Sequence, residues 1–323
     1  MKVRLKKYGP VLGIVLAAAL VPVLLPNPYL LRALGQVGLY MLLGLGLNFT
    51  LGYVGLFDLG YIAFYAIGAY TAAILSVHGW SFWLCLPASI AVALVFRLLV
   101  GIPILRLRGD YLAIVTMGFG EITRLVLNNL DGLTNGPRGL PRVGETIYPP
   151  GFFGMTLYTN THFYYLIFAA VLIAAVLSLR IEDSRIGRAW VAIREDEVAA
   201  ELVGVPVAEL KLLAFVISAV FAAVAGCLFA HWERFVTPES FVFWESILVV
   251  SIIVLGGMGS VPGILLGALI LEGAPLLMQS VLQQWIMYRY FLFGVLLVLV
   301  VMFRPQGLWA SKRRQSELLE EHS

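Results

Sequence analysis

Five ionisable side chains lie inside or beside strongly apolar stretches of the 323-residue chain: Asp58, Arg97, Glu121, Arg124 and Glu272. A charged group at membrane depth is costly, so it marks either a transport path or an ion pair that braces neighbouring helices. Glu121 and Arg124 are three residues apart on one predicted helix, a spacing that favours a local ion pair. Arg97 is able to pair with another carboxylate. The residue types alone leave both interpretations open for Asp58 and Glu272.

The sequence contains no motif for catalysis or nucleotide binding. It has no P-loop, no His-Glu-x-x-His and no Gly-x-Ser-x-Gly, and Cys85 and Cys227 lie in apolar runs without a metal-binding spacing. Too few histidines and carboxylates converge to predict a proton relay. We therefore expect no enzyme activity, no metal and no cofactor. Any uphill transport is expected to use ATP that another subunit hydrolyses.

The composition is that of a membrane protein. Hydrophobic residues make up 60% of the chain and charged residues 13%, the mean hydropathy is +0.91, and the formal net charge is +3. Soluble domains carry about 25% charged residues. These values exclude a soluble enzyme, a disordered chain and a conventional nucleic-acid-binding protein. They predict an all-α membrane protein with one transmembrane domain over residues 1–310 and a polar tail at 311–323.

Apolar runs close to the length needed to cross a bilayer predict about ten transmembrane segments. They cover roughly residues 10–26, 31–51, 59–77, 82–105, 111–127, 161–180, 211–231, 244–258, 261–278 and 290–304. The glycine-rich stretch Gly256–Ser260 separates the eighth segment from the ninth. These two form either one kinked span or two short spans.

Basic residues predict the orientation, because cytoplasmic loops carry an excess of Lys and Arg. With the N-terminus inside and ten crossings, fifteen Lys and Arg residues fall inside and five outside. Counting the eighth and ninth segments as one span would put the basic tail outside. We therefore favour ten crossings with both termini in the cytoplasm. The first helix is expected to stay uncleaved, because Pro26-Asn27-Pro28 follows its apolar run instead of a signal-peptidase site.

One polar stretch on the cytoplasmic side, residues 184–206, has the pattern of an amphipathic helix. Apolar residues recur at helical spacing at Trp190, Ile193, Val198 and Leu202, and a Gly-x-Pro sequence ends the pattern. Such a helix can lie in the lipid interface. Its acidic run at 195–197 would be repelled by anionic headgroups, which favours a cytoplasmic protein partner instead.

A second polar stretch, residues 128–160, is predicted on the external side. Its Asn-Gly and Gly-Pro pairs favour turns, and its length is typical of a functional or disordered loop. Composition alone leaves an external docking site and a solvated connector equally open.

Glycines cluster at residues 52–60 and 256–260, next to or between apolar segments. Small residues let transmembrane helices approach closely, which is our first interpretation of most of them. Clustered glycines can also break a helix, and the freed backbone groups then face a cavity where substrate binds.

Six stretches, in order between about residues 40 and 310, resemble the permease subunits of branched-chain amino-acid ABC importers, of the M type that pairs with a sister H-type permease. They are Gly55–Tyr70, Leu105–Ile122, Gly187–Glu197, Val236–Phe241, Val254–Ser260 and Arg304–Leu308. The resemblance implies a permease for leucine, isoleucine and valine. The same superfamily includes urea and amide importers, and an ion-coupled secondary transporter is the remaining alternative.

The resemblance implies that residues 184–206 form a coupling helix that rests on an ATPase subunit. Importer permeases of this kind often carry Glu-Ala-Ala-x3-Gly there. This chain has Ala199-Ala200-x3-Gly204, with Val198 in the Glu position and Glu197 one residue early. The candidate coupling residues are Arg188, Trp190, Ile193, Arg194, Glu195, Asp196, Glu197 and Gly204.

The resemblance also implies a bacterial inner-membrane location and three kinds of partner: a sister permease, two cytoplasmic ATPase subunits and a periplasmic solute-binding protein. Candidates for the substrate path are Asp58, Gly60, Tyr61, Glu121, Gly256, Gly257 and Gly259. Candidates for docking the binding protein are Thr134, Asn135, Arg138 and Glu239.

Overall fold

The computed structural model describes residues 27–105, 107, 109–141, 143, 151–152, 155–156, 160–273, 294–295, 298, 302–304 and 307–309, with 13 and 22. The predicted segment 10–26 apart from residues 13 and 22, most of segment 290–304 and the tail 311–323 lie outside the described residues. So do the basic residues of the N-terminus and Arg106 and Arg108 between the fourth and fifth predicted segments.

The described chain is almost entirely helical. Its α-helices are α2 Pro28–Asn48, α3 Tyr61–Val77, α4 Phe82–Ile104, α5 Asp110–Asn129, α6 Asp131–Thr134, α7 Asn160–Glu182, α8 Arg185–Glu195, α9 Glu197–Leu202, α10 Val207–Glu233, α11 Phe243–Gly256 and α12 Val261–Ala268. The π-helices η1 Phe49–Val54 and η4 Leu269–Gly273 extend α2 and α12, and η2 Gly136–Arg138 and η3 Pro238–Phe241 are 3₁₀ turns. Eight predicted segments, from 31–51 to 261–278, coincide with these helices over their described residues, which end at Gly273 in the last of them.

Short strands accompany the helices in the described ranges. They are β1 Leu140–Pro141, β2 Gly151–Phe152, β3 Met155–Thr156 and β4 Phe235–Val236. The strands β1 and β4 pair antiparallel, with Leu140 opposite Val236, and β2 pairs with β3.

Five helical stretches among the described residues are long and apolar enough to cross a membrane. They are Pro28–Val54, Phe82–Ile104, Asn160–Glu182, Val207–Glu233 and Pro238–Gly256. Tyr61–Val77 and Val261–Gly273 are apolar but shorter than the roughly 20 residues that a span usually needs. The chain is thus an all-α membrane protein, and the count of ten crossings stays a prediction.

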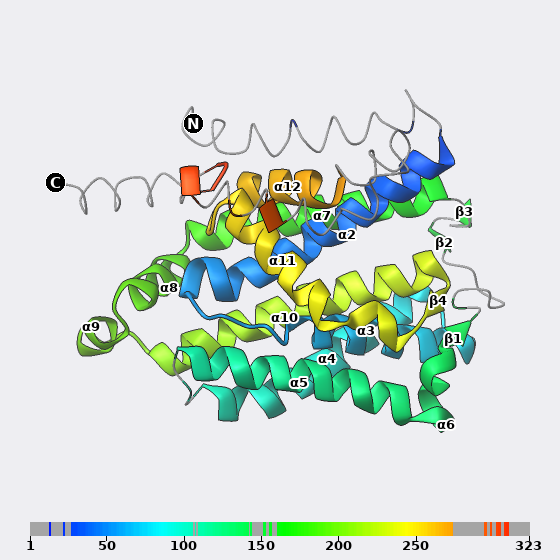
Figure 1. Cartoon of the computed structure of the whole chain (residues 1–323), viewed down its shortest axis with the longest axis horizontal. Helices are drawn as coiled ribbons and strands as arrows, with labels where there is room; N and C mark the ends of the chain where they lie inside the picture. Colours follow the sequence, from blue (N-terminus) through cyan, green and yellow to red (C-terminus); the bar gives the residue numbers. More distant parts are fainter. Residues whose placement is uncertain are drawn as a thin grey trace.

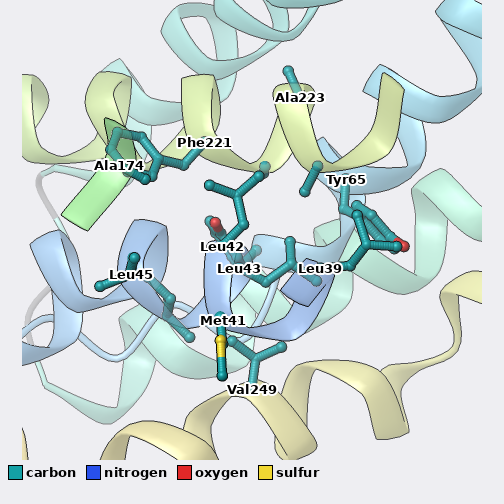
Figure 2. Packing of buried hydrophobic residues seen from close by; sticks show 14 of the residues in the cluster. Leu39, Met41, Leu42, Leu43, Leu45, Tyr65, Ala174, Phe221, Ala223 and Val249 are labelled. Atoms are coloured by element: carbon teal, nitrogen blue, oxygen red, sulfur yellow. The ribbon is translucent and has the colours of Figure 1, made fainter. Parts of the chain in front are cut away.

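Helices α2 and α10 form the centre of the bundle. Figure 1 shows α10 beside α3 and α4, and α2 beside α7, α11 and α12. Figure 2 shows Met41 and Leu42 of α2 between Phe221 of α10 and Val249 of α11. Because both central helices are covered on several sides, their apolar residues form one continuous core.

The chain reverses direction between α11 and α12, which form a tight antiparallel hairpin. A Cβ on Gly256 would lie 2.3 Å from the carbonyl oxygen of Gly263, and one on Gly267 would lie 2.4 Å from that of Ile252. Gly257 makes the reversal with a φ of +116°, which L side chains rarely adopt. The eighth and ninth predicted segments are therefore two short helices and not one kinked span.

The two polar stretches lie at opposite ends of the bundle. Figure 1 places α8 and α9 at one end of the long axis, and α6, β1 and β4 at the other. The pairing of β1 with β4 ties the 128–160 stretch to the connection between α10 and α11. The side of the membrane that each stretch faces stays a prediction.

We expect Gly256→Ala to destabilise the protein, because the new Cβ would collide with the backbone of α12. Overpacking of this kind lowers the free energy of unfolding by about 1–3 kcal/mol. Thermal unfolding of the detergent-solubilised protein measures the change. Gly118→Ala is the matched control, because a Cβ there meets nothing within 4 Å. Equal unfolding midpoints for the two variants would contradict the close packing of the hairpin.

Candidate functional site

The 184–206 stretch folds as two helices, α8 and α9, where the sequence pattern predicted one. Asp196 interrupts the helix with extended backbone angles (φ −152°, ψ 108°). Its Oδ1 accepts hydrogen bonds from the backbone N–H groups of Val198 and Ala199, both at 2.9 Å, and so caps α9. Aspartate is a favoured N-cap residue, and here it starts a new helix. This explains why a stretch whose apolar residues keep helical spacing throughout folds as two helices.

The α8–α9 segment, residues 184–206, is fastened to the bundle by Trp190. The side chain of Trp190 is fully buried, and its Nε1 donates to the carbonyl oxygen of Leu210 at 2.8 Å. Its ring stacks on Tyr53 at 6.4 Å between centroids and meets Phe49 edge-on at 5.9 Å. Ile193 is buried beside it. These two apolar candidates therefore hold the α8–α9 segment on its own bundle.

Two charged contacts add to this attachment. Arg194 Nη1 donates to the carbonyl oxygen of Gly52 at 2.8 Å, at the π-helical end of the α2–η1 unit. Lys211 of α10 is only 5% exposed, and its Nζ lies 2.6 Å from Glu197 Oε2. The three acidic residues at 195–197 therefore have different surroundings: Asp196 caps α9, Glu197 pairs with Lys211, and Glu195 is exposed.

The outer side of the α8–α9 segment exposes large apolar side chains. Leu202 is 83% exposed and Val203 80% exposed, and Gly204 ends α9 with a φ of +85°. We call this surface the docking face. It consists of Ile186, Arg188, Glu195, Val198, Glu201, Leu202 and Val203, all exposed. Exposed apolar groups rimmed by charges are typical of a surface that binds another protein.

Asp58, just before α3, and Arg97, in the second half of α4, form a buried ion pair. Arg97 Nη2 donates to Asp58 Oδ2, and Arg97 Nε donates to the carbonyl oxygen of Phe215 at 3.1 Å. The guanidinium lies over the rings of Phe64 and Phe215, at 4.4 and 4.1 Å from their centroids. Asp58 is thus the carboxylate with which Arg97 pairs, as the sequence allowed. This contact favours a role for Asp58 in bracing neighbouring helices over a role in transport.

The other substrate-path candidates lie in separate packing contacts. A Cβ on Gly60 would be 2.2 Å from the carbonyl oxygen of Thr116, so the glycine lets α5 approach α3. Glu121 Oε1 is 2.6 Å from Arg124 Nη2, the local ion pair that their spacing predicted.

The remaining four candidates for the substrate path are also surrounded by protein. Tyr61, Gly256, Gly257 and Gly259 are buried. The N–H of Gly259 donates to Asn48 Oδ1 at 3.0 Å, which joins the 256–260 turn to α2. The two glycine clusters thus meet: a Cβ on Gly52 would lie 2.7 Å from the backbone nitrogen of Gly259.

The external docking candidates divide into buried and exposed residues. Thr134 is buried and its Oγ1 donates within the loop, to the carbonyl oxygens of Leu127 and Leu130. Asn135 adopts left-handed backbone angles and holds the turn through a 2.7 Å hydrogen bond to the carbonyl oxygen of Gly139. Arg138 and Glu239 are exposed. Asn135 is exposed as well, so three of the four candidates lie at the surface.

A polar cavity among the described residues was missed by the sequence reasoning. It has a volume of about 400 Å³ and lies between α2, α10 and α11, next to β4. Arg32, Gln36 and Tyr40, spaced four residues apart on α2, line one wall. This polar i, i+4, i+8 stripe in an otherwise apolar helix is the signal that would have indicated it.

A larger cavity of about 650 Å³ lies on the side of the bundle between α2, α4, α7 and α10. Leucine, alanine and aromatic side chains line it almost throughout, and Phe221 and Trp83 are among them. Such a lining suits hydrocarbon, so the smaller cavity is the better candidate for a polar solute.

Comparison with known proteins identifies close relatives. The family described as "Branched-chain amino acid transport system / permease component" matches residues 29–301. The high-affinity branched-chain amino acid transport system permease protein LivM of Escherichia coli is 42% identical over 301 residues, covering 87% of this chain and 70% of that protein. The related permease protein LivH of Escherichia coli is 36% identical over 132 residues, 41% of this chain and 42% of LivH. The permease protein BraD of Pseudomonas aeruginosa is 37% identical over a segment of the same length. No solved structure matches the chain.

We expect Asp58→Asn to destabilise the protein strongly, because Arg97 would stay buried without a carboxylate. Breaking a buried ion pair in this way costs about 3–5 kcal/mol. Glu239→Gln is the control: it removes the carboxylate from an exposed pair with Arg124, at 3.0 Å, and exposed pairs contribute about 1 kcal/mol or less. The free energy of unfolding in detergent is the measurement. If both variants unfold alike, Asp58 is not a brace.

Proposed function

The chain belongs to the branched-chain amino acid transport permease family, and we propose that it is the M-type permease subunit of an ATP-driven importer of leucine, isoleucine and valine. The identity of 42% with LivM across 87% of the chain carries this proposal. The relatives reported above are all named for branched-chain amino acids, which favours these substrates over urea or short amides. Asp58 and Glu121 already pair with arginines, and Glu272 accepts a hydrogen bond from Gln36. Because these are the three carboxylates that an ion-coupled mechanism could use, that mechanism is disfavoured.

We further propose that the chain works within a larger assembly in the bacterial inner membrane. The similarity to both LivM and LivH supports pairing with a sister permease that forms the other half of the translocation path. The absence of a nucleotide-binding motif from the sequence supports two separate cytoplasmic ATPase subunits. A periplasmic solute-binding protein would approach the opposite end, where Arg138 and Glu239 are exposed. The excess of basic residues in alternate loops supports cytoplasmic termini.

The docking face of the α8–α9 segment is the proposed contact with the ATPase. Leu202 and Val203 supply apolar area, and Arg188, Glu195 and Glu201 supply charges that can fix the register of the contact. Because Trp190 and Lys211 hold the segment to α10, a movement of the ATPase subunits would be transmitted to the bundle as a rigid-body tilt. ATP-driven closure of the ATPase pair would then open the path on one side of the membrane and close it on the other.

Replacing Leu202 and Val203 together by Glu tests this contact. The variant should bind the ATPase at least about tenfold more weakly, a loss of about 1.4 kcal/mol, because two charges would enter an apolar interface. Both side chains are exposed, so the fold of the permease should be unaffected. Co-purification of the ATPase and leucine uptake by cells are the measurements.

Leu133→Glu is the matched control, because Leu133 is an exposed leucine at the other end of the bundle. It should leave ATPase binding unchanged. Unchanged ATPase binding and unchanged uptake in the Leu202 and Val203 double variant would contradict the proposed coupling contact.

A further inference from the structure

Three polar side chains of α2 each contact a carboxylate from a different part of the chain. Arg32 Nη2 lies 2.5 Å from Glu233 Oε2 at the end of α10, and Gln36 Nε2 donates to Glu272 Oε1 of η4 at 2.8 Å. The hydroxyl of Tyr40 donates to Glu245 Oε2 in the first turn of α11. One face of α2 therefore gathers carboxylates that are far apart in the sequence.

The polar cavity of about 400 Å³ combines three kinds of wall. Five of the side chains in these contacts line it: Arg32, Gln36, Tyr40, Glu233 and Glu245. Arg32 supplies a positive charge, and Glu233 and Glu245 supply negative charges. Leu39, Phe229 and Trp232 supply apolar surface. Ligand sites in proteins usually have volumes of about 300–1,000 Å³, mostly apolar walls and a few polar groups that fix orientation.

We propose that this cavity binds the zwitterion of an aliphatic α-amino acid on its way through the permease. The carboxylate of the amino acid would bind Arg32, and its ammonium group would bind Glu233 and Glu245. The branched side chain would lie against Leu39, Phe229 and Trp232. This assignment rests on the proposed function, and it names a site for the substrate class that the function implies.

The mixture of charges is what selects this ligand class. A neutral amide such as urea has no charged group for Arg32 or Glu245 and no aliphatic part for the apolar wall. A simple cation would use the carboxylates and would be repelled by Arg32. An aliphatic zwitterion uses all three walls at once, and its two charges lie close together, as those of Arg32 and Glu233 do.

The existing Arg32–Glu233 contact explains how such a site can release its ligand. The side chain of Arg32 is 61% exposed and that of Glu233 is 29% exposed, so their ion pair is largely solvated. Solvated ion pairs contribute little to stability, so a zwitterion can replace this contact, and the contact can re-form when the zwitterion leaves. A transport path needs this exchange, because tight binding would trap the solute.

Uptake by the complete importer tests the cavity. The complex is reconstituted in proteoliposomes, with leucine-loaded binding protein outside, and leucine uptake and ATP hydrolysis are measured together. Arg32→Gln and Glu245→Gln should each lower leucine uptake per ATP by about tenfold or more, because each leaves one charge of the zwitterion without its partner. Stimulation of ATP hydrolysis by the binding protein should stay within about twofold of wild type, because the ATPase contact lies at the other end.

Arg180→Gln and Glu209→Gln are the matched controls, because both residues are exposed and lie outside the cavity and the docking face. They should leave both measurements near wild type. A wild-type complex that imports no leucine would refute the proposed function itself. A wild-type complex that imports leucine, with cavity variants indistinguishable from the controls, would refute the cavity alone.

A second measurement does not depend on the folding of any variant. A diazirine analogue of leucine is delivered by the binding protein to the wild-type complex, irradiated during turnover, and its adducts are mapped by mass spectrometry. Adducts on Leu39, Phe229 or Trp232 support the site. If the complex imports the analogue but adducts form only elsewhere, or not at all, the assignment is overturned.

Discussion

The attachment of the α8–α9 segment to the bundle is the constraint on which the proposed mechanism depends. The segment is short and polar, and its helices are too short to be stable alone in water. Trp190, Arg194 and Lys211 hold it through one buried ring, one hydrogen bond to a backbone carbonyl and one ion pair whose lysine is buried. A contact made on its outer face therefore acts on α10 and on the end of α2, the two central helices.

The buried pair of Asp58 with Arg97 extends this rigidity into the membrane-spanning region. It joins the loop before α3 to α4, and the bond to the carbonyl of Phe215 adds α10. The hairpin of α11 and α12 reaches the same end of α2 through Gly259 and Asn48. Ionisable groups at this end thus brace the bundle, whereas those around Arg32 line a cavity at the other end.

The sequence predicted the positions of the described apolar helices, because each lies in a long apolar run, but the number of membrane crossings stays a prediction. It also located the α8–α9 segment and the Glu121–Arg124 pair, both of which are local patterns. It missed the break at Asp196, because a helix-capping aspartate looks the same as a surface aspartate until backbone angles are known. It missed the polar cavity, because Arg32 and Glu233 are joined only by the packing of α2 on α10.

Rigid attachment of the α8–α9 segment is tested most directly by a distance between spin labels at Arg185→Cys and Leu99→Cys in the assembled importer. Both positions are exposed, and the native Cys85 and Cys227 are buried and should not take label. The account predicts the same distance distribution in the nucleotide-free and ATP-bound complexes, because segment and bundle move as one body. A shift in the mean distance on ATP binding, in a complex that still imports leucine, would contradict it.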